Sequence, residues 1–216
     1  MRRGNPLGKV VLGLVVLTVF GILFASALRD VASEPYTVSA GDLRQWTVAL
    51  HQRSGPDGPL IVLRPPTALP MGLFDQVFQR TMESFTTPVE PGIPLVLQRE
   101  FVSSLAGAVT PEELVGLARG AGLENASLRP HCMAVHRTSG GREQRQFFVL
   151  FELPQLAQFR ASVASVVQAR GGTGVPFDPE AVSAALLVAT SDARLLWQVP
   201  RRAGLEGECE APVTSG

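Results

Sequence analysis

Val10–Leu28 is the feature that most constrains this 216-residue chain, because it is an uninterrupted apolar run at the N-terminus. Its nineteen residues include no charged side chain, and Thr18 and Ser26 are the only polar ones. A helix of that length extends roughly 28 Å, about the thickness of the hydrocarbon core of a bilayer. The sequence therefore predicts a membrane-directed helix over residues 1–28.

The charges beside this run predict its orientation. Arg2, Arg3 and Lys9 precede it, and no acidic residue lies in the first 28 positions. Basic flanks remain in the cytoplasm, so the C-terminal part should lie outside it, in the periplasm or the extracellular space.

Two interpretations of the segment remain open. An uncleaved single-pass anchor would use all of Val10–Leu28. A signal peptide would use Val10–Phe24 as its apolar region and would be cleaved after Ala27, since Ala25-Ser26-Ala27 resembles an A-x-A site. The fifteen apolar residues before that site are long for a signal peptide, which favours the anchor.

The charge of the remaining chain excludes one class of partner. After residue 28 there are 16 basic and 19 acidic side chains, a net charge of −3. Nucleic-acid binding needs a clustered basic face, so no nucleic-acid partner is expected. One lysine against eighteen arginines is typical of a GC-rich genome and favours a bacterial source.

Hydrophobic periodicity predicts one α+β domain over residues 42–200, after a spacer at 29–41 and before an irregular tail at 201–216. We expect a mainly antiparallel sheet with helices packed on one side. The predicted strands are Trp46–Gln52, Pro59–Leu63, Leu95–Gln98, Pro130–Thr138, Gln144–Leu153, Ala185–Val188 and Leu195–Val199. The predicted helices are Leu69–Phe85, Pro111–Ala121, Gln155–Ala169 and a short helix opening at Asp178.

The start of the second helix carries the clearest local signal. Thr110 and Glu113 have the spacing of a capping box, and Pro111 suits the first helical position. Gly122 fits the left-handed position that ends such a helix.

Two stretches 85 residues apart resemble each other. Ala49–Gly55 and Ala134–Gly140 each precede a second apolar strand and then a helix. This pattern is consistent with two ββα-type halves in one domain. The alternative is that two hairpins share turn chemistry by chance.

Cys132 and Cys209 are the only cysteines, and an even pair in an exported chain predicts a disulfide. A bridge between them would close a loop of 77 residues and stabilise the fold by about 4.5 kcal/mol in the chain-entropy model. There is no C-x-x-C motif that would indicate a redox-active pair.

The cluster from His131 to His136 contains possible metal ligands, but strand geometry argues against a metal site. On a regular strand His131 and Cys132 would point to opposite faces. Cys132 and His136 would share a face about 13 Å apart, too far for ligands of one ion. No metal and no other cofactor is expected.

A scan for catalytic motifs finds no nucleophile elbow, zinc-protease helix, phosphate-binding loop or calcium loop. His51 and His136 occupy equivalent positions in the two proposed halves, and we regard them as weak surface-site candidates. The favoured hypothesis is a membrane-anchored envelope protein with a non-catalytic binding or assembly domain, whose partner is a protein or peptide. The alternative is an exported hydrolase whose active site the sequence does not reveal.

Overall fold

The computed structural model of this chain describes residues 15–21, 34–51, 55–140, 142–171, 175–200 and 207–216. The chain forms two compact units, Met1–Glu34 and Pro35–Gly216. In the first unit, residues 15–21 are helical and exposed. Among the described residues, no helix combines the length and apolarity needed to cross a membrane. The rest of the predicted segment Val10–Leu28, including the possible cleavage site after Ala27, lies outside the described residues.

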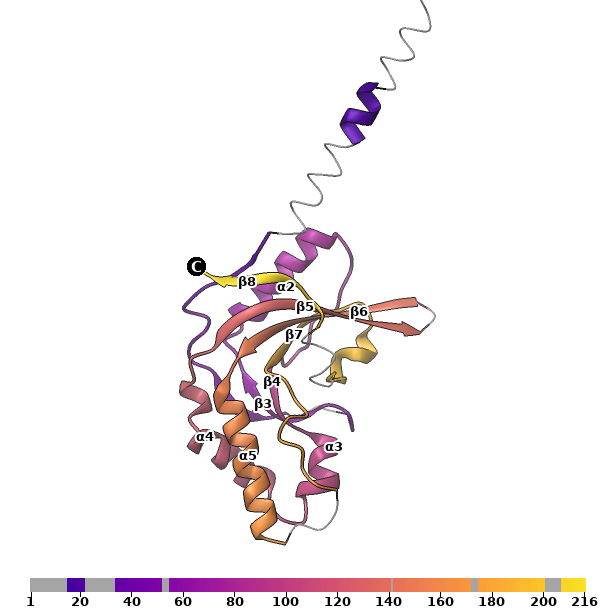
Figure 1. The fold of residues 1–216 in the computed structure, drawn as a ribbon. Coiled ribbons are helices and arrows are strands. Elements are labelled where there is room, and N and C mark those ends of the chain that lie inside the picture. The colour runs from indigo at the N-terminus through magenta and orange to yellow at the C-terminus, as the bar shows by residue number, and fades with distance from the viewer. Residues whose placement is uncertain (1–14, 22–33, 52–54, 141, 172–174, 201–206) are drawn as a thin grey trace, which may run out of the picture. The chain divides into compact units, whose positions relative to one another are not determined.

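The second unit is an α+β fold with mainly antiparallel strands, as the sequence predicted (Figure 1). Its strands form a five-stranded sheet in the order β1-β8-β5-β6-β7 and a three-stranded sheet in the order β2-β3-β4. The first sheet consists of β1 (Tyr36–Val38), β8 (Cys209–Ser215), β5 (Arg129–Gly140), β6 (Arg142–Glu152) and β7 (Ala185–Thr190). The second consists of β2 (Thr47–Leu50), β3 (Pro59–Arg64) and β4 (Ile93–Leu97).

Three helices begin within one residue of their predicted starts, but α2 ends at Thr81, four residues before the predicted Phe85, because Met82 adopts a left-handed φ of 54°, and α3 was not predicted. Thr110 and Glu113 form the expected capping box at the start of α4, and Gly122 has a left-handed φ of 73° after it. The helices are α2 (Ala68–Thr81), α3 (Gln98–Glu100), α4 (Pro111–Gly120) and α5 (Pro154–Ala169), and short turns of other helix types are η1 (Phe101–Leu105), η2 (Leu123–Asn125) and η3 (Ala193–Trp197).

The sequence predicted one sheet, and the structure contains two. Three consecutive strands of each sheet have the same order of elements, β2-β3-α2-β4 in one sheet and β5-β6-α5-β7 in the other, and β1 and β8 complete the five-stranded sheet. In the first half β2 pairs with β3 and β3 with β4, while in the second β5 pairs with β6 and β6 with β7, all antiparallel. Of the two stretches that resemble each other in sequence, Ala49 and Leu50 lie in β2 and Ala134–Gly140 lies in β5, while residues 52–54 lie outside the described residues.

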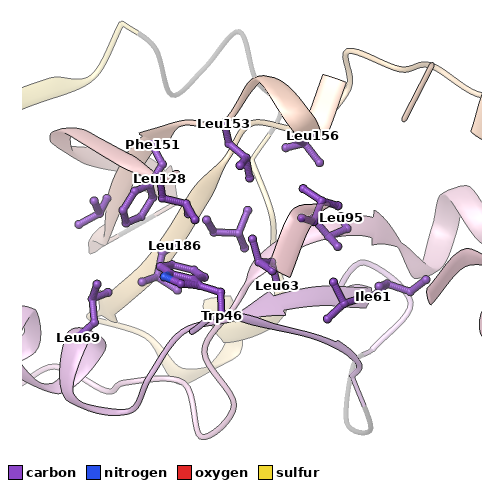
Figure 2. Packing of buried hydrophobic residues seen from close by; sticks show 14 of the residues in the cluster. Trp46, Ile61, Leu63, Leu69, Leu95, Leu128, Phe151, Leu153, Leu156 and Leu186 are labelled. Carbon is purple, nitrogen blue, oxygen red and sulfur yellow. The ribbon is translucent and has the colours of Figure 1, made fainter. Parts of the chain in front are cut away.

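The main core lies between the two sheets and the helices. Figure 2 shows Trp46, Leu63 and Leu186 directed toward one another from both sheets. The Trp46 ring meets Phe151 of β6 edge to face, with the ring centres 5.5 Å apart. Because both halves supply this core, they fold as one unit.

The opposite face of the five-stranded sheet is also buried, which explains the continuous apolar runs of β6 and β7. Phe148, Leu150 and Leu187 point to this face and form a second cluster with Leu196, which follows β7. Cys132 belongs to the same cluster, so the disulfide described below lies on this side of the sheet.

Four local predictions are corrected. The stretch predicted as a strand at Leu195–Val199 begins with the helical turn η3, which Gln146 anchors by donating from Nε2 to the Leu195 carbonyl at 2.9 Å. The helix expected at Asp178 is a turn held by Arg160. The expected irregular tail contains β8, a central strand, and the expected spacer contains β1, with which β8 pairs in parallel.

The outer edges of β1 and β2 are covered by side chains. Gln76 of α2 accepts from the Thr37 N–H at 2.9 Å and donates to the Thr37 carbonyl at 2.8 Å. Glu124 accepts from the Val48 N–H at 2.8 Å, and Arg119 donates to the Val48 carbonyl at 3.3 Å. These bonds occupy backbone groups that would otherwise be open to another strand.

Candidate functional site

A groove of about 810 Å³ beside the disulfide combines an apolar lining with several polar groups. One wall consists of the end of β6 and the first turns of α5. The other consists of the segment between Pro179 and Ala184, and His131 and Cys209 also line the groove. Its apolar lining includes Leu150, Phe151, Leu153, Leu156, Ala157, Ala161 and Val182, and its polar lining includes Glu152, Glu180 and Ser183.

The first wall follows from the local sequence. Strand β6 ends at Glu152, and Pro154 begins α5 because its missing N–H needs no partner in the first turn. Leu156 is buried, whereas Ala157 and Ala161 are exposed one turn apart on α5. These small side chains leave the groove open.

The second wall is held by a buried arginine. The Arg160 guanidinium donates to the carbonyls of Asp178 at 2.6 Å and Pro179 at 2.9 Å. It also packs over the Phe177 ring, 4.5 Å from the ring centre. A segment without regular structure is therefore fixed against α5.

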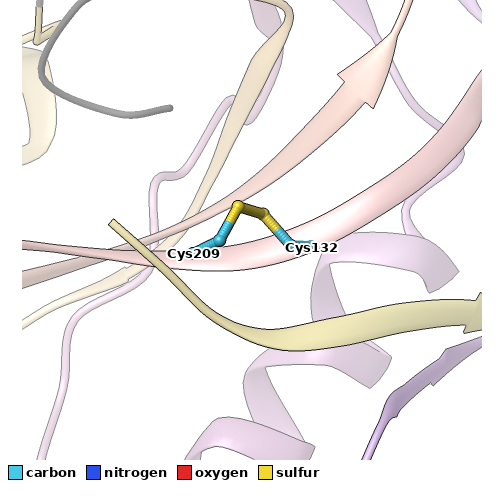
Figure 3. Close-up of a disulfide and its surroundings, with 2 residues drawn as sticks. All are labelled: Cys132 and Cys209. Carbon is cyan, nitrogen blue, oxygen red and sulfur yellow. A yellow bond between two sulfur atoms is a disulfide. The ribbon is translucent and has the colours of Figure 1, made fainter. Parts of the chain in front are cut away.

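The predicted pair Cys132 and Cys209 is brought to bonding distance across β5 and β8, with Cα atoms 5.7 Å apart (Figure 3). Cys132 is buried, and Cys209 is exposed at the groove. The bridge ties the C-terminal strand to the first strand of the second hairpin.

The expectation that His131 and Cys132 point to opposite faces of a regular strand is overturned by a β-bulge. Pro130 pairs with Phe151 and Cys132 pairs with Leu150, so His131 is the extra residue. A bulge redirects the side chain of the extra residue. A ring nitrogen of His131 and the sulfurs of Cys132 and Cys209 all lie within 4.8 Å of one another.

His51, predicted as a surface-site candidate, is buried. It follows β2, and its Nε2 lies 3.3 Å from the Glu90 carbonyl oxygen and 3.9 Å from the Glu90 carboxylate. Arg64 lies 3.6 Å from the same carboxylate. Burial lowers the pKa of His51 and outweighs the opposing effect of Glu90. Pro88, Pro91 and Pro94 line the same small cavity as the His51 ring.

His136, the other candidate, is partly exposed on β5. Its Nδ1 lies 2.8 Å from a carboxylate oxygen of Glu208. The groove contains neither His51 nor His136 among its lining residues. The sequence candidates are thus two separate histidine–glutamate pairs and do not form a common site.

Sequence reasoning missed the groove residues themselves. Glu152, Glu180 and Ser183 come from segments that meet only after α5 has packed. The Ser183 hydroxyl is buried and has no hydrogen-bond partner in the described part of the chain. The bulge at His131 left one trace in the sequence, because Pro130 cannot donate a ladder hydrogen bond.

Function has to be inferred from these residues. Comparison of the chain with protein-family models, with curated proteins and with solved structures found no match.

Proposed function

We propose that the folded unit is a non-catalytic binding or assembly domain of the bacterial cell envelope, anchored in the membrane by Val10–Leu28. The groove beside the Cys132–Cys209 pair is the proposed binding site. The observation that carries the proposal is the combination of a cavity of about 810 Å³ with an apolar floor and acidic groups. Ligand sites are typically apolar clefts of this size with a few polar groups.

The chemistry of the lining indicates the kind of partner. Glu152 and Glu180 are exposed, so the groove favours a basic group. The apolar wall along Ala157 and Ala161 favours an aliphatic or aromatic side chain. We therefore propose that the partner is a peptide segment of another envelope protein with an apolar anchor next to an arginine or lysine.

The side chains that cover the edges of β1 and β2 favour binding of a peptide in the groove over addition of a peptide strand at these two edges. A peptide that extended a sheet at β1 or β2 would have to displace Gln76 from Thr37, or Glu124 and Arg119 from Val48. Ser183, by contrast, lines the groove, and its buried hydroxyl has no hydrogen-bond partner among the described residues.

The arrangement of the histidines supports binding over the alternative of a hydrolase. A hydrolytic triad needs a nucleophile in hydrogen-bond reach of its base. The described residues that line the cavity at His51 include no serine, threonine or cysteine. In the oxidised chain the two sulfurs are bonded to each other.

Selection from a random peptide display library against the full-length protein in detergent tests the proposed chemistry. We expect enrichment of short peptides that combine an apolar side chain with arginine or lysine. Ala157→Arg should abolish binding of these peptides, because the arginine side chain fills the groove and its positive charge repels the arginine or lysine of the peptide. Glu152→Gln with Glu180→Gln should weaken binding at least about tenfold, in line with the loss of a charge-assisted contact.

Ala169→Arg is the matched control, because Ala169 is exposed on the same helix and does not line the groove. Peptides that bind Ala157→Arg as well as they bind the wild type would exclude the groove as the binding site. In cells, a photocrosslinker at position 157 should yield a discrete product that a crosslinker at position 169 does not yield.

The membrane anchor is tested separately. Mass spectrometry of the mature N-terminus in isolated membranes should find the intact segment Val10–Leu28. A mature chain that begins at Leu28 would instead establish cleavage after Ala27 and a secreted domain.

A further inference from the structure

The bulge in β5 gathers two sulfurs and an imidazole at one end of the groove. The side chains of His131, Cys132 and Cys209 have their ligand atoms within 4.8 Å of one another. In a tetrahedral zinc site with bonds of about 2.0–2.3 Å, the ligand atoms lie about 3.5 Å apart. Small side-chain rotations in the reduced chain would reach that spacing, and β5 and β8 would keep their register.

We propose that reduction of the Cys132–Cys209 disulfide creates a three-ligand site for Zn²⁺ from His131, Cys132 and Cys209. A dithiol reductant is oxidised to its own disulfide, and the two cysteines take up two electrons and two protons as the S–S bond breaks. Zn²⁺ then displaces both thiol protons to solvent and binds two thiolates and one neutral imidazole nitrogen.

The composition of the cluster suits this ion. Thiolate and imidazole are preferred ligands of zinc and of other soft or borderline metals, whereas calcium and magnesium prefer oxygen. Two thiolates balance the charge of Zn²⁺. Three protein ligands leave a fourth position for water or another ligand, beside a groove that His131 and Cys209 line.

Zinc binding at this site requires the reduced state, because sulfurs joined in a disulfide are not available as thiolate ligands. Cys209 is exposed, so a reductant can reach its sulfur, while Cys132 is buried in the second apolar cluster. This inference is independent of peptide binding, because it uses neither Glu152, Glu180 nor the wall formed by α5.

Metal titration of the full-length protein in detergent tests the proposal. The chain is reduced with dithiothreitol, freed of it by gel filtration under argon, and titrated with Co²⁺ and then with Zn²⁺ against a chromophoric chelator. We expect one equivalent of either ion to bind the reduced chain, with thiolate-to-cobalt charge-transfer absorption. The oxidised chain should bind neither ion at the same concentrations.

His131→Ala keeps the disulfide and should lower zinc affinity in the reduced state at least about tenfold. His136→Ala is the matched control, because this histidine lies on the same strand outside the cluster, and its affinity should equal that of the wild type. Equal affinity of His131→Ala and the wild type would overturn the proposal. Circular dichroism monitors the fold, and a reduced chain that unfolds and binds no metal would overturn it as well.

Discussion

The guanidinium of Arg160 on α5 is fully buried and forms two hydrogen bonds to the carboxylate of Glu100, at 2.5 and 3.2 Å. Its remaining N–H groups donate to the backbone carbonyls of Leu95, Asp178 and Pro179. Five donors on one side chain are thus satisfied in the interior, where an unpaired charge would be costly. This residue connects β4, α3 and the groove wall to α5.

Arg160→Met should destabilise the fold by about 3–5 kcal/mol, because it leaves the largely buried Glu100 carboxylate and three carbonyls without their donor. Urea denaturation followed by fluorescence measures the change. The control is Arg170→Met, which removes an exposed pair with Glu113 and should cost far less than Arg160→Met because solvent screens the pair. Equal losses in the two variants would contradict the structural role assigned to Arg160.

Stability should fall as the pH drops through 6.5, the ordinary pKa of histidine. Burial lowers the pKa of His51 in the folded state, so between that lowered value and 6.5 the unfolded chain binds a proton that the folded chain does not. Above 6.5 the ring is neutral in both states and this contribution to stability is complete. Denaturation midpoints between about pH 5 and pH 8 measure the slope.

His51→Gln should flatten this pH dependence, since glutamine does not titrate. His136→Gln serves as the comparison, because it removes the other described histidine–glutamate pair and leaves the buried ring in place. A slope that persists in His51→Gln would assign the effect to another group.

Replacement of both cysteines by alanine should destabilise the oxidised protein by about 4–5 kcal/mol, the chain-entropy value for a loop of 77 residues. Denaturation with and without dithiothreitol measures the effect. In the double variant the reductant should have no effect, whereas in the wild type it should reproduce most of the loss. An unchanged wild type under fully reducing conditions would contradict the assigned contribution.

Gln76→Ala should destabilise the fold by about 1–2 kcal/mol and should increase self-association, because it removes two hydrogen bonds and uncovers the Thr37 backbone at the edge of β1. Sedimentation velocity measures the association, and urea denaturation measures the stability. Gln79→Ala is the control, since Gln79 is exposed on the same helix. Identical sedimentation of both variants would contradict a protective role for Gln76.

Local sequence signals predicted most elements because they act within a few residues. The capping box of Thr110 and Glu113 specified the start of α4, and the apolar runs at Pro59–Leu63 and Gln144–Leu153 specified β3 and β6. Strand β1 was missed because it has only three residues, and β8 because only Ala211 and Val213 of its seven residues are buried. Their stability comes from pairing with each other and with β5, across almost the whole length of the folded unit.

The histidine at position 131 illustrates the limit of such signals. Alternation along a regular strand places it opposite Cys132, and the inference is sound for a regular strand. The β-bulge adds one residue to β5 relative to β6, and the ligand atoms of His131 and Cys132 come within 4.8 Å of each other. That residue is extra only because of how β5 registers with its neighbour, which no local pattern in β5 specifies.

By itself, the sequence determined most of the longer elements of the second unit, their mainly antiparallel character and the cysteine pair, because periodicity, turn residues and cysteine count are local or compositional properties. Only the tertiary structure decided that the strands divide into two sheets, that His51 is buried against Glu90, and that a groove lies beside Cys209. These features depend on contacts between segments far apart in the chain, and the energy of such contacts arises only when the core has packed.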